Sequence, residues 1–73
     1  MNSPKTDRRV KYTKMVLRQS LLELMKTKPI EKITVKEICE HADINRGTFY
    51  THYSEPRALL AQIQDELSNE IKA

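Results

Sequence analysis

Hydrophobic residues recur at the three- and four-residue spacing of an α-helix in four segments of this chain. The pattern predicts a long first helix over about residues 7–28, ended by Pro29, and a last helix over about 54–72. Between them it predicts two short helices, over about 34–42 and 45–51. No segment keeps the alternation of a β-strand, so we expect an all-α domain of four helices.

The two short helices begin with the same combination of residues. Each has a polar N-cap, with apolar residues just before the cap and four positions into the helix that can form a hydrophobic staple. The caps are Thr34, which has Glu37 at capping-box spacing, and Asn45. Only residues 42–44 separate the two helices, and so short a turn is typical of a helix-turn-helix. The staple pairs are Ile33 with Ile38 and Ile44 with Phe49.

The predicted helix 45–51 combines an apolar inner face with a polar outer face. If Phe49 and Tyr53 point inward, its first turn presents polar groups, as helices that read the major groove of DNA do. Arg46 has the fork geometry that pairs with guanine, and Gly47 lets the backbone approach the groove. Further candidates for base or phosphate contacts are Thr34, Lys36, Asn45, Thr48, Tyr50 and His52.

Several of these residues also have a purely structural interpretation. Thr34 can be only a helix cap, Tyr50 a half-buried structural tyrosine, and His52 an exposed turn residue without contacts. Cys39 fits a small buried core residue, and together with the two histidines it lacks metal-ligand spacing. Gly47 is the only glycine, so there is no phosphate-cradling loop, and no catalytic set appears. We expect no enzyme, no metal site and no cofactor.

Charge is distributed unevenly along the chain. Residues 1–36 contain ten Lys/Arg and three acidic residues, a net charge of +7, whereas residues 37–73 have a net charge of −4. A basic first half fits a surface that faces a polyanion, although a solvated helix face is the alternative. Residues 1–6 form a polar segment that we interpret as a flexible basic arm. The arm and the residues just after it supply phosphate attraction through Lys5, Arg8, Arg9 and Lys11.

The length of 73 residues corresponds to one small domain. No apolar run approaches the roughly 20 residues of a membrane span, and the amino terminus lacks a signal-peptide apolar region. We therefore expect a cytoplasmic protein. The apolar stripe of helix 54–72 continues through Leu67 and Ile71, for which the short helices offer no partner. The stripe predicts a helix that leads into a further domain, with a frayed terminus as the alternative.

The segment 33–53, ITVKEICEHADINRGTFYTHY, resembles the amino-terminal DNA-binding domain of the TetR/AcrR family of transcriptional regulators, over about Val16–Leu60. The resemblance implies a homeodomain-like three-helix core over residues 7–73, with helix 45–51 in the major groove of double-stranded DNA. It also implies a homodimeric repressor on a palindromic operator, with an absent carboxy-terminal domain that dimerises and binds an inducer. We expect the chain alone to be mainly monomeric.

The sequence departs from the family pattern at three places. Asp43 stands where the turn usually has glycine, and Pro29 replaces a frequent glycine. Pro56 occupies the position of a common phosphate-contacting lysine, so Arg57 is the candidate to take over that contact. The alternative function is a small helical protein-interaction module that uses the apolar stripe of helix 54–72. Its docking face would need apolar anchors, whereas the outer face of helix 45–51 is mostly polar.

Overall fold

The computed structural model describes the backbone of residues 4–72 and the side chains of residues 8–67. Within this range the chain forms five helical elements and no strand, which confirms the all-α fold expected from the sequence. The elements are α1 (Pro4–Leu24), the 3₁₀ turn η1 (Ile30–Lys32), α2 (Val35–Ala42), α3 (Arg46–His52) and α4 (Pro56–Lys72).

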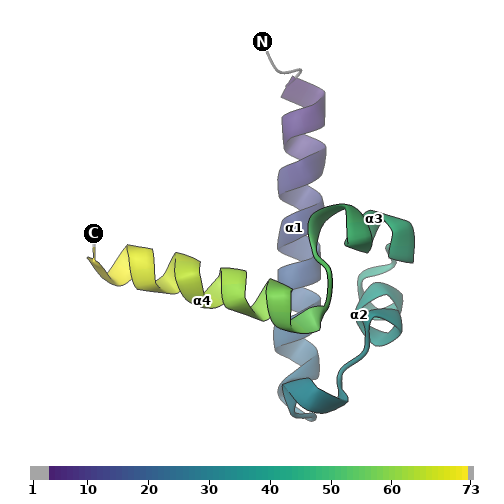
Figure 1. Ribbon diagram of the computed structural model, residues 1–73. Coiled ribbons are helices and arrows are strands. Elements are labelled where there is room, and N and C mark those ends of the chain that lie inside the picture. Colours follow the sequence, from purple (N-terminus) through teal and green to yellow (C-terminus); the bar gives the residue numbers. More distant parts are fainter. Residues whose placement is uncertain (1–3, 73) are drawn as a thin grey trace.

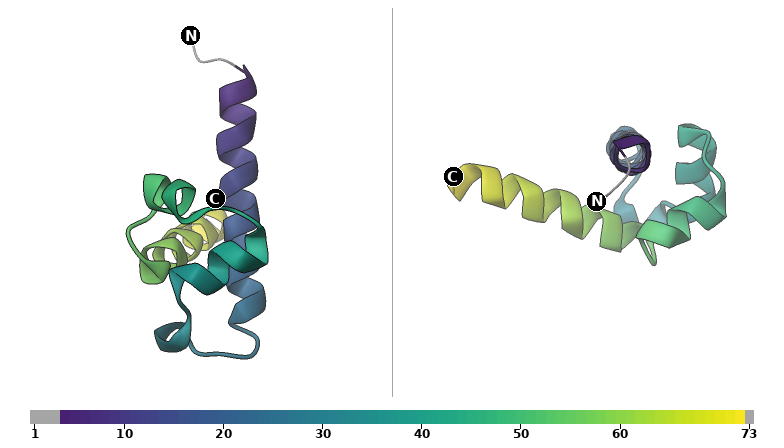
Figure 2. Two further views of the ribbon diagram at one scale, coloured as in Figure 1. Left: turned by 90° about the vertical axis from the view of Figure 1, so that its right-hand side faces the viewer. Right: turned by 90° about the horizontal axis from the view of Figure 1, so that it is seen from above.

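Helix α1 is the central element of the fold. The two short helices α2 and α3 lie on one side of it, while α4 crosses it and extends away on the other side (Figures 1 and 2). Helix α1 packs against both α2 and α4, and α2 packs against α3. The α2–α3 pair therefore has an outer face that neither long helix covers.

The core draws apolar side chains from all four helices. Leu17 and Leu21 of α1, Phe49 of α3 and Leu59 of α4 are at most 1% exposed. Burial of a side chain of this size contributes about 1.5–3 kcal/mol relative to its exposure to water. The other buried apolar residues are Ile33, Ile38, Cys39, Tyr53 and Ile63, so the interpretation of Cys39 as a core residue is confirmed.

Helix α1 begins and ends earlier than the sequence pattern predicts. Residues 4–6 are helical rather than part of a flexible arm, and Pro4 suits a first helical position because its missing N–H has no helical partner there. At the other end the helix stops at Leu24 instead of residue 28. The N–H groups of Lys26 and Thr27 turn back to carbonyls only three residues earlier, and the Thr27 hydroxyl donates to the Leu24 carbonyl at 3.3 Å. These local bonds replace the last helical turn.

Two leucines that lie beside core residues are not themselves buried. The side chain of Leu22, next to Leu21 in α1, is 42% exposed. Ser20 is buried instead, with its hydroxyl 3.1 Å from Nδ1 of His41 on α2. In α4 the core residue is Leu59, whereas Leu60 is only half-buried. In α4 the buried stripe therefore runs through Leu59 and Ile63, whereas in α1 it keeps Leu17 and Leu21 and faces away from Leu22.

Candidate nucleic-acid interface

The start of α2 is fixed by a capping box. The glutamate of this box also pairs with Lys28, which lies in the turn after α1. The N–H of Glu37 donates to Oγ1 of Thr34 at 3.1 Å, and the Thr34 N–H donates to Oε1 of Glu37 at 3.2 Å. The other carboxylate oxygen of Glu37 accepts a hydrogen bond and ion pair from Nζ of Lys28. That hydrogen bond lowers the pKa of Glu37, although partial burial opposes it. The carboxylate therefore connects the turn after α1 to the start of α2.

The turn between α2 and α3 is a Schellman motif centred on Asp43. Asp43 lies in the left-handed region, with φ 58° and ψ 47°, and its N–H donates to the carbonyls of Cys39 and Glu40. The N–H of Ile44 then donates to the Cys39 carbonyl at 3.0 Å. Aspartate is one of the few residues other than glycine that adopts this conformation readily. Asp43 thus adopts at this turn the left-handed conformation for which glycine is the usual residue.

Helix α3 is fastened by its cap and by two inward aromatic rings. Oδ1 of Asn45 accepts the N–H of Thr48 at 2.8 Å, as expected for an N-cap. Phe49 is fully buried, and its ring lies 5.7 Å from that of Tyr53, which is 7% exposed. The inner face predicted from the sequence is the observed one. A helix of seven residues is held here by contacts at its start, middle and end.

The outer face of α3 carries most of the predicted DNA-contacting residues. Arg46, Gly47 and Tyr50 are exposed, and Thr48 and His52 are half-buried. Tyr50 is 56% exposed, and its ring meets that of Phe49 edge-on at 5.7 Å. The exposure leaves the Tyr50 hydroxyl accessible, so the half-buried interpretation does not describe it.

Thr51, which is not among the predicted contacts, is exposed on the same face of α3 as Gly47, four residues earlier. Its hydroxyl donates to the Gly47 carbonyl at 3.0 Å.

A shallow hollow of about 370 Å³ separates the outer faces of α2 and α3. Lys36 of α2, the N-cap Asn45 and Arg46 of α3 line it, together with two carboxylates that were not predicted to lie there, Glu40 and Asp43. Burial raises the pKa of the Cys39 thiol, and the nearby positive charge of Arg46 opposes that rise only in part. The hollow therefore combines two cations with two acids at the junction of the helix pair.

The other predicted residues lie away from this junction, are already engaged, or lie outside the described side chains. The Thr34 hydroxyl donates to Oε1 of Glu37 at 3.3 Å within the capping box. Arg57 donates to Glu31 of η1 at 3.2 Å, which places it beside η1. The remaining basic candidates, Arg8, Arg9 and Lys11, are exposed on α1, and the side chain of Lys5 lies outside the described residues.

Two further findings concern other kinds of site. Within the described part of the chain, no group of three His, Cys, Asp or Glu residues is placed to hold a metal ion. None of the described helices combines the length and apolar character needed to cross a membrane.

Comparison with known proteins identifies the helix-turn-helix. The family model described as bacterial regulatory proteins, tetR family, matches residues 18–63. A curated relative, an uncharacterized HTH-type transcriptional regulator YxbF from Bacillus subtilis (strain 168), is 31% identical over 51 residues. That alignment covers 70% of this chain but only 13% of the length of the relative. No solved structure matches the chain.

Proposed function

The chain belongs to the tetR family of bacterial regulatory proteins, and from this premise we propose that it is the operator-reading head of a repressor. The family identifies it as a helix-turn-helix DNA-binding transcriptional regulator and not as an enzyme. The proposal adds that α3 lies in the major groove with Arg46, Gly47, Thr48 and Tyr50 toward the DNA. A protein bound to bacterial DNA in this way acts in the cytoplasm.

The observation that carries this proposal is the division of α3 into two faces. Phe49 and Tyr53 are buried, whereas Arg46 and Tyr50 on the same short helix are exposed. The buried rings fix the direction of the helix, so the exposed side chains keep a defined position relative to one another. Arg46 can then donate two parallel hydrogen bonds to O6 and N7 of a guanine. The Tyr50 hydroxyl suits a phosphate oxygen.

Gly47 supports the same orientation. A Cβ added at this position would meet Asn45 Oδ1 at 3.3 Å and no other atom within 4 Å. The protein would need to shift by only a few tenths of an ångström to accept it. Packing within the protein therefore gives little reason for a glycine, whereas close approach of the helix backbone to DNA gives one.

The remaining contacts would be to phosphates. Lys36 and Asn45 line the hollow between α2 and α3, so both can reach a strand that follows the edge of the groove. The exposed Arg8, Arg9 and Lys11 extend along α1 and supply attraction that does not depend on sequence. Thr34, His52 and Arg57 are secondary candidates, and Arg57 would have to exchange Glu31 for a phosphate.

We propose that the complete regulator is a homodimer that binds a palindromic operator. Two heads related by two-fold symmetry match two half-sites, and their joint binding is much tighter than that of one head. The dimer contacts and the inducer site would belong to a domain outside this chain. We expect the chain alone to sediment mainly as a monomer and to bind DNA weakly. A tight dimer of the chain alone in analytical ultracentrifugation would contradict this expectation.

The alternative of a protein-docking α4 has less support. Leu59 and Ile63 of the predicted stripe are buried in the core, where they are 1% and 3% exposed. Among the described side chains of that stripe, Leu67 is the one that is largely exposed, at 47%. A single exposed leucine is ordinary for a protein surface.

The experiment that tests the proposed function is duplex binding at two salt concentrations, after selection of a preferred site from random duplexes. Arg46→Ala should cost about 1–3 kcal/mol at the preferred site and relax the choice at one base pair. Arg8→Ala, the matched control, should weaken all duplexes alike and reduce the salt slope by about one. Absence of salt-sensitive binding at low ionic strength would reject the proposal. If Arg46→Ala reduces the affinity for every duplex equally, Arg46 contacts a phosphate and not a base.

A further inference from the structure

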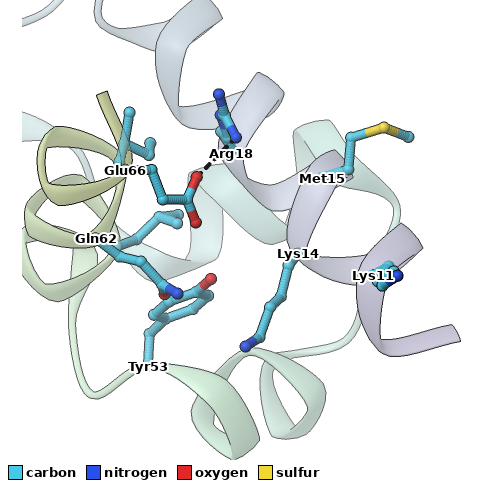
Figure 3. A pocket seen from close by; sticks show the side chains of 9 residues that line it. Lys11, Lys14, Met15, Arg18, Tyr53, Gln62 and Glu66 are labelled. Carbon is cyan, nitrogen blue, oxygen red and sulfur yellow. Dashed lines mark hydrogen bonds and ion pairs between the residues drawn. The ribbon is translucent and has the colours of Figure 1, made fainter. Parts of the chain in front are cut away.

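A second concave site lies at the corner where α4 crosses α1, and none of the candidate DNA-contacting residues of α3 lines it. It is a pocket of about 210 Å³ between the two long helices (Figure 3). Its lining residues are Lys11, Lys14, Met15 and Arg18 of α1, Tyr53, and Leu59, Gln62, Ile63 and Glu66 of α4.

We propose that this pocket binds a small amphipathic carboxylate. Its carboxylate would lie toward Lys14 and the Tyr53 hydroxyl, and its apolar body would lie over Leu59 and Ile63. Such a combination of apolar walls with a few convergent polar groups is typical of small-molecule sites.

The charges around the pocket favour an anion. Glu66, the acidic residue in the lining, accepts a hydrogen bond from Arg18 at 2.8 Å and is neutralised by it. Lys11 and Lys14 have no carboxylate partner among the residues whose side chains the structure describes. Lys11 and Lys14 therefore make the mouth of the pocket positive, so that it attracts a carboxylate and repels an amine.

Tyr53 supplies a directed hydrogen-bond donor. The residue is 93% buried, as only 7% of its surface is exposed, yet its hydroxyl forms no hydrogen bond with any described residue. Figure 3 shows the ring between Gln62 and Lys14 with its hydroxyl toward the pocket. Burial and the nearby Glu66 raise the pKa of this phenol, so it keeps its proton at neutral pH. Since no buried side-chain oxygen or nitrogen of the described residues lacks a partner, the hydroxyl itself is open to solvent at the pocket, where it can donate to a carboxylate in place of water.

A ligand bound in the pocket would also affect the position of α3. The N–H of Tyr53 donates to the Phe49 carbonyl at 2.9 Å and closes the last turn of α3, and the two rings lie 5.7 Å apart. A ligand that moves the Tyr53 ring would therefore shift the inner face of α3. The carboxylate would at the same time reduce the positive charge of the head. Both effects weaken DNA binding, and this regulatory part rests on the proposed function.

The site is tested without DNA by titrating the ¹⁵N-labelled chain with 3-phenylpropionate and following the amide signals by NMR. The matched probe is 3-phenylpropanamide, which has the same shape without the charge. We expect the carboxylate to bind about fivefold more tightly than the amide, with the largest shifts at Lys14, Tyr53 and Gln62. Lys14→Gln should abolish this preference. Lys26→Gln, an exposed lysine of the same segment paired with Glu23 at 3.0 Å, should leave it unchanged.

Equal affinity for the two probes, or shifts centred elsewhere, would overturn the site. The regulatory part is tested by duplex binding with and without saturating 3-phenylpropionate, where we expect the affinity to fall at least about twofold. Binding of the probe at the pocket with unchanged DNA affinity would overturn the regulation alone. A chain that binds the probe but never binds DNA would leave the site standing and reject the proposed function.

Discussion

The short pair α2–α3 and the long pair α1–α4 hold their helices in different ways. Helices α2 and α3 have eight and seven residues, well below the roughly 12–15 at which isolated helices become even marginally stable. Their positions depend on a capping box, a Schellman turn, an N-cap and the buried Phe49. Helices α1 and α4 have 21 and 17 residues and are positioned by apolar packing at one crossing.

The difference places helix ends fixed by hydrogen bonds on one face of the molecule and a pocket between two crossing helices on the other. Every end of the α2–α3 pair has a specific hydrogen bond, so the exposed residues between those ends are held in register. The corner of α1 and α4 has a pocket that side chains leave unfilled. A surface that reads DNA needs the first property, and a site that accepts a ligand needs the second.

The largest expected effect concerns the anchor of the short pair. Phe49→Ala should lower the free energy of unfolding by about 3–5 kcal/mol, because a fully buried ring is replaced by a cavity. Tyr50→Ala, the neighbouring exposed aromatic, should change it by less than about 0.5 kcal/mol. Urea denaturation followed by circular dichroism measures both. Similar losses for the two variants would mean that α3 does not have two distinct faces.

The helix caps of the α2–α3 pair should contribute less to the free energy of unfolding than the buried Phe49. Thr34→Ala should lower the free energy of unfolding by about 1 kcal/mol, since it leaves the Glu37 N–H without its acceptor. Gln19→Ala, at an exposed position within α1, serves as the control. If both variants unfold at the same urea concentration, the capping box does not stabilise the pair.

The same capping box predicts how stability responds to acid. The pKa of Glu37 is lowered in the folded protein, chiefly by its hydrogen bond with Lys28. Its contribution is therefore complete above the ordinary glutamate value of 4.5, and it is lost as pH falls through the lowered pKa. Glu37→Gln should lose less stability than the wild type between pH 5 and pH 2, as measured by urea denaturation. An unchanged pH dependence in this variant would show that the Lys28 interaction does not act in solution.

A substitution in the turn should change stability in the opposite direction. Asp43→Gly should raise the free energy of unfolding by up to about 1 kcal/mol, because glycine adopts the left-handed conformation without steric cost. Asp43→Ala should lower it for the same reason. Thermal unfolding of the three proteins checks the order Gly, Asp, Ala. Any other order would place the turn in a different conformation.

The smallest expected effect concerns the contact between the start of α4 and η1. The ion pair of Arg57 with Glu31 joins two side chains that are 59% and 62% exposed. A double-mutant cycle with Arg57→Ala and Glu31→Ala should give a coupling energy of about 0.2–1 kcal/mol that decreases with salt. A larger, salt-independent coupling would make the start of α4 a third fixed point of the fold.

The short pair was predictable from sequence because its determinants are local. Thr34 with Glu37, and Asn45 with the N–H of Thr48, are separated by three residues, so the spacing itself indicates the contact. The end of α1 was not predictable in this way. It depends on turn hydrogen bonds after Leu24 and on the ion pair of Lys28 with Glu37, nine residues away.

Contacts between residues far apart in the sequence were also not predictable from it. Arg57 contacts Glu31 across 26 residues, and Arg18 contacts Glu66 across 48. Helical spacing cannot relate residues that meet only because two helices cross. For the same reason helical spacing does not indicate the pocket around Tyr53, which forms where α4 packs against α1.

The central claim is that the outer face of the α2–α3 pair faces DNA. The most direct measurement is the NMR spectrum of the ¹⁵N-labelled chain during titration with its selected duplex at low salt. The claim predicts that the largest shifts occur at Lys36, Arg46, Gly47 and Tyr50, with little change around Leu67 of α4. Shifts centred on α4, with the signals of α3 unchanged, would contradict it.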